Sequence, residues 1–102
     1  MGYFTYSLTV KTMEIRFEGP HYYCDADEAG FFELMYSLPE YIEVIGKGRE
    51  LVLKLEDPVT YESSIQLLTM FHRWGIDKDV LTPLKTKENE NNDLWNKSVK
   101  YV

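Results

Sequence analysis

The chain has 102 residues, of which 44% are hydrophobic and 15% aromatic, and its formal net charge at pH 7 is −6. This length predicts one α+β domain over residues 1–102, with enough apolar residues to form a core. The sequence contains no run of 18 apolar residues that would suggest a membrane span, and its first residues lack the basic flank and apolar run of a signal peptide. A single cysteine rules out an internal disulfide, so we expect a cytoplasmic protein.

Residues 3–18 alternate apolar and polar side chains, which is typical of a β-strand. The alternation changes phase between Val10 and Met13, so the apolar residues before and after this point would face opposite sides of one regular strand. A β-bulge in a single long strand would correct the phase, and so would a hairpin that turns at Lys11-Thr12. Lys and Thr are unfavourable in a two-residue turn, which argues against the hairpin. A single strand of about 15 residues would be unusually long, which argues against the bulge. Both interpretations therefore stay open.

A Gly-Pro pair ends this segment, and a helix is predicted after it. Asp25 is the expected N-cap, and Glu28 three residues later completes a capping-box pattern in which Asp replaces Ser or Thr. The helix is expected to run to about Ser37, because Pro39 disfavours the helical conformation at the residue before it. Its apolar face consists of Phe31, Phe32, Leu34, Met35 and Leu38.

The next stretch is predicted to be a β-hairpin. Four of residues 41–45 are β-branched or aromatic, which suits a strand, and residues 51–55 alternate leucine with other residues, which suits a second strand. The three residues between them, Gly46-Lys47-Gly48, are predicted to form the loop, in which Gly48 takes a positive φ. The leucine face of the second strand is expected to point into the core.

Asp57 and Pro58 are predicted to cap and begin a second helix, because Asp accepts bonds from free N–H groups and Pro has no N–H to lose at the first position. The helix is expected to end at Gly75 in the left-handed conformation, with Ile76 packed back on the helix. Its apolar face consists of Tyr61, Ile65, Leu67, Leu68, Phe71, His72 and Trp74. The predicted core is formed by Phe32, Met35, Leu51, Leu53, Leu55, Ile65, Leu68 and Phe71.

The pattern weakens after the second helix. Asp77 is expected to cap one short turn, residues 85–93 are polar and are predicted to form a loop, and residues 94–102 fit either a strand or a short helix. The predicted class is therefore α+β: a two-layer sandwich with an antiparallel or mixed sheet and two helices on one face. A last strand would complete the ferredoxin-like order β-α-β-β-α-β.

Few residues suggest catalysis or metal binding. A closed structural zinc site needs four His or Cys ligands, and the chain offers only His21, His72 and Cys24. The sequence contains no Gly-x-Ser-x-Gly turn, no phosphate-binding loop and no cluster of Lys and Arg that would suggest a nucleic-acid groove. We therefore predict no catalytic residue, no metal ligand, no cofactor and no nucleic-acid partner.

The acidic residues are concentrated in the middle of the chain. From Glu18 to Glu62 there are eleven acidic and three basic residues, so this segment carries a charge of −8, while the segments on either side each carry +1. Acidic patches attract basic partners, and tyrosine is a frequent anchor at interfaces. The alternative interpretation is a solvated face that keeps the protein in solution. The residues predicted to contact a basic protein partner are Asp25, Asp27, Glu28, Glu33, Tyr36, Glu40, Tyr41 and Glu43.

With acidic stretches such as Asp25-Ala26-Asp27-Glu28 and Ser37-Leu38-Pro39-Glu40-Tyr41, the chain resembles a small bacterial immunity protein, the kind made beside a secreted toxin nuclease. The resemblance is one of type and matches no family motif, so no functional residue is carried over. It implies a non-catalytic inhibitor that neutralises a basic toxin by masking its active site. The alternatives are a small ferredoxin-like enzyme or ligand-binding domain, with a site around His72, Cys24 or His21, and a structural homodimer that uses an exposed sheet.

Overall fold

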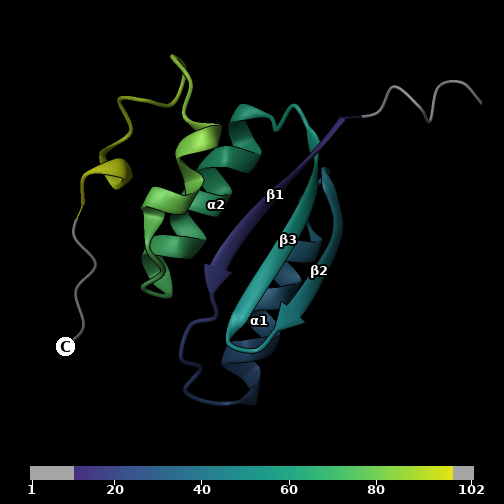
Figure 1. Cartoon of the computed structure of the whole chain (residues 1–102). Coiled ribbons are helices and arrows are strands. Elements are labelled where there is room, and N and C mark those ends of the chain that lie inside the picture. The colour runs from purple at the N-terminus through teal and green to yellow at the C-terminus, as the bar shows by residue number, and fades with distance from the viewer. Residues whose placement is uncertain (1–10, 98–102) are drawn as a thin grey trace, which may run out of the picture.

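The computed structural model describes residues 11–97, and it has an antiparallel sheet with helices packed on one of its faces (Figure 1). The strand order in the sheet is β1-β3-β2, and both neighbours of the central strand β3 run antiparallel to it. The elements in chain order are β1 (Lys11–Glu18), α1 (Asp25–Tyr36), β2 (Tyr41–Lys47), β3 (Glu50–Asp57), α2 (Tyr61–Arg73), and the 3-10 helices η2 (Lys78–Leu84) and η3 (Asp93–Trp95). The predicted α+β class is confirmed.

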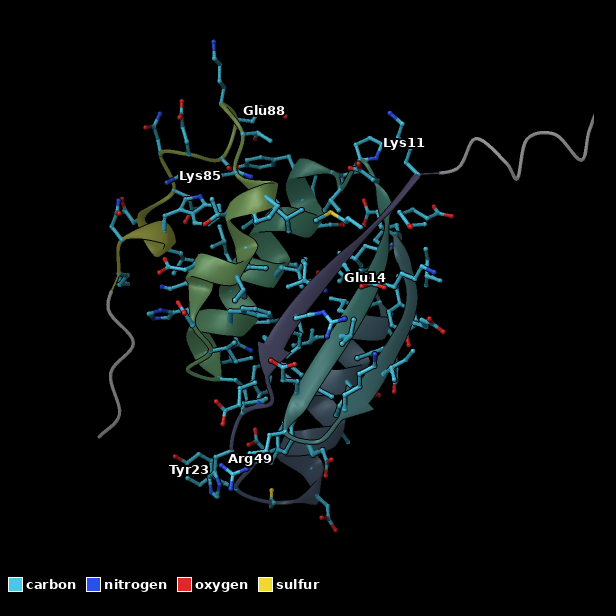
Figure 2. All side chains as sticks on the ribbon, viewed as in Figure 1. Lys11, Glu14, Tyr23, Arg49, Lys85 and Glu88 are labelled. Atoms are coloured by element: carbon cyan, nitrogen blue, oxygen red, sulfur yellow. The ribbon has the colours of Figure 1, made fainter. Side chains whose placement is uncertain are left out.

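The pairing register separates the two faces of the sheet. Leu53 in the central strand lies between Ile15 of β1 and Val44 of β2, and this row points toward the helices. Side chains alternate along a strand, so the neighbouring row around Lys54 points to the opposite side. That side is the open face of the sheet, on which Figure 2 labels Glu14.

The core lies between the sheet and the two helices. Of the eight residues predicted to form it, five are buried (Met35, Leu53, Leu55, Leu68 and Phe71), and the other three are partly buried and pack against them (Phe32, Leu51 and Ile65). The rings of Phe17 and Phe71 join β1 to α2 with their centroids 4.8 Å apart. The leucine face of β3 therefore points into the core, as predicted.

The hairpin loop is shorter than predicted. Gly46 and Lys47 remain in β2, paired with Leu51 and Glu50, so the loop consists of Gly48 and Arg49. Gly48 has a φ of 62°, and no non-glycine residue of the described chain has a positive φ. A positive φ at the first loop residue alone is the pattern of a type II′ turn, whose twist suits a two-residue hairpin.

Both predicted helix starts are wrong. The N-cap of α1 is Cys24, whose side chain makes no capping bond. The N-cap of α2 is Thr60, whose hydroxyl accepts a hydrogen bond from the N–H of Ser63 at 3.2 Å. Asp57 does not cap α2, because it is the last residue of β3 and pairs with Lys11.

The predicted end of α2 is confirmed. Gly75 has a φ of 73°. The N–H of Ile76 donates to the carbonyl oxygen of Phe71 at 2.8 Å, and Ile76 is buried. This is the bonding pattern of a Schellman motif with its apolar contact.

The described part of the chain contains three strands, so its order is β-α-β-β-α without the fourth strand of a ferredoxin-like fold. η2 packs beside β1 and α2, with Leu81 and Leu84 buried. The predicted loop over residues 85–93 is present up to residue 92, and its last residue, Asp93, begins η3. Asn89 anchors the loop from a buried position: its Nδ2 donates to the Leu84 carbonyl and to the Ser64 hydroxyl at 2.9 and 3.0 Å.

Two predicted segments fall partly outside the described residues. Lys11 and Thr12 are paired with β3 as part of one strand, so the alternative with a hairpin turn at these residues is wrong. The other half of that prediction, residues 3–10, lies outside the described range. At the C-terminal end, Asp93–Trp95 forms a 3-10 helix, while residues 98–102 again lie outside. Within residues 11–97, no helix is long and apolar enough to cross a membrane.

Candidate functional site

The charge on α1 is entirely acidic. The helix carries Asp25, Asp27, Glu28 and Glu33 and contains no Lys or Arg. In the sequence, the 30 residues between Arg16 and Lys47 contain seven acidic residues and no Lys or Arg. The helix therefore carries four negative charges with no compensating base of its own.

Three of these acidic side chains have no protein partner in the part of the chain that the structure describes. Asp25, Glu28 and Glu33 are exposed and make no hydrogen bond or ion pair there. The one ion pair of residues 11–97 joins Arg16 to Glu50 at 4.0 Å, on the open face of the sheet. The charges of α1 are therefore available to a partner.

Asp27 is the exception among the α1 acids because it is bonded on both oxygens. Its Oδ2 accepts a hydrogen bond from the N–H of Tyr23 at 3.1 Å, and its Oδ1 accepts one from the indole N–H of Trp74, also at 3.1 Å. The first bond ties the loop before α1 to the helix, and the second ties α1 to the end of α2. Asp27 therefore has a structural role that its sequence position did not reveal.

A row of aromatic rings runs beside the free acids, formed by Tyr22, Phe32, Tyr36 and Tyr41. Successive centroids are 6.3, 6.1 and 5.2 Å apart, distances typical of interacting aromatic pairs. Tyr36 is 53% exposed. At the helical period, positions 25, 28, 32, 33 and 36 fall on one side of α1. We call the surface made by Asp25, Glu28, Glu33, Tyr36 and Tyr41 the α1 face.

The tyrosines at both ends of this row stay protonated at neutral pH. Burial, followed by the negative charges of Glu28 and Asp27, raises the pKa of Tyr22 to about 12. Burial, followed by the neighbouring Tyr36, also raises the pKa of Tyr41. The buried hydroxyl of Tyr22 has no hydrogen-bond partner among the described residues. The row therefore presents uncharged tyrosine rings beside the acidic side chains of α1.

Two of the predicted contact residues lie away from the α1 face. Glu40 is only 6% exposed, and its Oε2 accepts a hydrogen bond from the N–H of Thr60 at 2.9 Å, so it holds the start of α2. Burial alone would raise the pKa of Glu40, but hydrogen bonds from Ser63 and Thr60 outweigh it and lower the pKa. Glu43 lies on the open face of the sheet, opposite Lys54.

A cleft of about 930 Å³ lies between the end of β1 and the end of α2. His21 and His72 both line it, together with Asp27 and Trp74, whereas Cys24 does not. The sequence singled out the two histidines but gave no sign that they share a cleft. No group of three His, Cys, Asp or Glu residues within 11–97 could hold a metal ion.

His72 is held by a buried lysine that no sequence pattern marked. The Nζ of Lys78 lies 3.1 Å from His72 Nδ1 and donates to the carbonyl oxygens of Leu94 and Lys97. Burial, followed by the charges of Lys78 and Lys97, lowers the pKa of His72. A neutral His72 accepts on Nδ1 and keeps its N–H on Nε2. Lysine is rarely buried, so only the folded chain reveals this contact.

Comparison with protein-family models found no match to this chain, and neither the curated proteins nor the solved structures gave one. The function proposed below therefore depends on the charges, contacts and exposure of this chain's own residues.

Proposed function

We propose that the protein is a non-catalytic binding protein that neutralises a basic toxin, such as a nuclease, by covering its active site with the α1 face. The observation that supports this most is the set of free charges on α1. Asp25, Glu28 and Glu33 have no counter-charge within residues 11–97, and they adjoin the exposed ring of Tyr36. Carboxylates attract the charges of lysine and arginine side chains, and an exposed tyrosine ring beside them can make cation–π contacts with the same side chains.

The two kinds of residue on the α1 face have different roles in this proposal. Exposed charges act at long range, so the acids raise the rate of encounter with a basic partner. The tyrosines act at contact, because tyrosine is enriched among the few residues that carry most of the binding energy at interfaces. Tyr36 and Tyr41 are already packed against each other at 5.2 Å, so little side-chain freedom is lost when a partner docks on them.

Capture of the partner from the native cell tests the proposal. Tagged wild-type protein is expected to retain a basic protein whose enzymatic activity falls on binding. A variant with Asp25, Glu28 and Glu33 all changed to Lys is expected to lose both capture and inhibition. The matched control changes Glu14, Glu56 and Glu88 to Lys, which alters net charge equally at exposed positions outside the α1 face. Figure 2 labels two of them, Glu14 and Glu88. Equal behaviour of the two variants would contradict the proposal.

A second candidate function is favoured by the cleft. A small enzyme or ligand-binding domain would use His21 and His72, which line one hollow, where burial and then the charge of Lys78 lower the pKa of His72. His72→Gln is expected to leave capture and inhibition unchanged if the α1 face is the functional surface. Loss of function in this variant, with the fold intact by circular dichroism, would favour the cleft.

A further inference from the structure

We propose that β2 is the site at which two copies of this chain associate, edge to edge, into a continuous six-stranded sheet. β2 is an edge strand: β3 pairs with one of its sides, and no strand of residues 11–97 pairs with the other. Figure 1 shows no helix beyond that free side. Unpaired backbone N–H and C=O groups along such an edge are a template for another strand.

The length of the regular edge fixes the centre of the pairing. A register irregularity lies between Tyr41 and Glu43, and the two-residue turn follows Lys47. Regular strand therefore extends from Glu43 to Lys47, with Ile45 at its middle. An antiparallel copy that pairs with this whole stretch sets Ile45 opposite Ile45 of the second copy, on a two-fold axis.

The backbone groups that point to the free edge of β2 belong to the residues that this register requires. The pair that flanks a two-residue turn, here Lys47 and Glu50, directs its N–H and C=O groups toward each other. Because these directions alternate along an antiparallel strand, the groups of Val44 and Gly46 point to the free edge. In the proposed register, Val44 faces Gly46 of the second copy, so the outward groups of each copy meet those of the other. The N–H of Val44 hydrogen-bonds the Tyr41 side chain within one copy, and association would replace that bond with one to the second copy.

The side chains of the open face are complementary in the same register. Glu43 meets Lys47 of the second copy, and by symmetry this ion pair occurs twice. Each pair extends a row that the sheet already contains, since Glu43 lies opposite Lys54 and Lys47 lies opposite Glu50. The extended row then reads acid, base, acid, base, acid from Glu14 of one copy to Glu50 of the other. It ends one strand farther on at Glu18 of the second copy, where two acids are neighbours.

On the open face, the two Ile45 side chains would lie on either side of the two-fold axis, and Val52 of each copy would lie one strand farther out. Ile45 is 44% exposed, which is unusual for an isoleucine. Its neighbour across the sheet, Val52, lies on the same face and is only 5% exposed. Association would place Val52, Ile45, and Ile45 and Val52 of the second copy in one row, so that the two exposed isoleucines bury each other.

Exchanging the charges of Glu43 and Lys47 tests the register, and the amount of dimer is the quantity measured. We expect the wild type to show a concentration-dependent dimer by sedimentation velocity. Glu43→Lys and Lys47→Glu, taken singly, each place like charges opposite each other twice, and should weaken the dimer about tenfold or more. The double variant, or an equimolar mixture of the two single variants, restores both ion pairs and should recover the dimer. Circular dichroism confirms that each variant is folded.

A disulfide tests the two-fold axis directly. In a Cys24→Ser background, Ile45→Cys should oxidise to a covalent dimer, because opposed residues of a non-hydrogen-bonded pair lie within disulfide range. Lys54→Cys is the matched control, since it lies on the same face but one strand farther from the axis. A wild type that stays monomeric at every concentration, a double exchange that fails to restore association, or equal oxidation of the two cysteine variants would overturn the proposal.

Discussion

The α1 face and the open face of the sheet carry similar acidic residues in different surroundings. On the sheet, Glu14 and Glu43 lie on either side of Lys54, and Glu50 pairs with Arg16. On α1, the exposed acids have no basic neighbour on the helix at all. Net charge alone therefore does not mark a functional surface, because charges that a fold already compensates have less effect on a partner than charges that it leaves free.

The scaffold that separates these two faces should be the easiest feature to break. Leu53 and Lys54 are neighbours in β3 that point to opposite sides, and Leu53 is fully buried. We expect Leu53→Ala to lower the free energy of unfolding by about 2–5 kcal/mol, because it leaves a cavity. Lys54→Ala should change it by about 0.5 kcal/mol or less. Urea denaturation measures both, and equal losses would contradict the assigned faces.

Within α1, one acid should differ from the rest in its effect on stability. Asp27→Ala removes the acceptor of the Trp74 indole and of the Tyr23 N–H, so we expect a loss of about 1–3 kcal/mol. Asp25→Ala removes an exposed charge at the start of the helix, where its effect on the helix dipole is less than about 1 kcal/mol. Thermal denaturation compares the two. A larger loss for Asp25→Ala would mean that the free and structural acids are wrongly assigned.

The acids of α1 should also be detectable through Tyr22, whose pKa they help to raise from its ordinary value of 10 to about 12. Between these values the folded protein keeps the phenol proton and the unfolded chain loses it. Stability from this group is therefore fully present below pH 10 and falls as the pH rises toward 12. Spectrophotometric titration should show a tyrosine component near pH 12 that Tyr22→Phe removes. Its persistence in the variant would contradict the assignment.

The sequence was sufficient for the features that repeat along the chain. Alternating leucines identified the buried face of β3, and the glycine at position 75 marked the end of α2. Where one residue could fit two different elements, the sequence did not show which element it joins. Asp57 has the chemistry of a helix cap, but pairing with Lys11 keeps it in a strand, and Thr60 caps α2 instead.

The candidate site shows the same limit. The concentration of acid in the sequence pointed to α1, but burial of Glu40 and the bonds of Asp27 depend on Thr60 and Trp74, which lie 20 and 47 residues away. Likewise, Glu43 falls on the open face of the sheet because a register irregularity precedes it in β2. Contacts between residues far apart in the chain have no local pattern, so the predicted surface included residues that the fold uses elsewhere.

The most direct test of the α1 face is the salt dependence of association with the captured partner, measured by stopped flow. At low ionic strength, changing Asp25, Glu28 and Glu33 to Lys should slow association about tenfold or more. The effect should vanish near 1 M salt, where the Debye length is about 3 Å. Changing Glu14, Glu56 and Glu88 to Lys alters net charge equally and should slow association much less. If both variants slow association alike, or neither does, the free acids of α1 do not guide the partner.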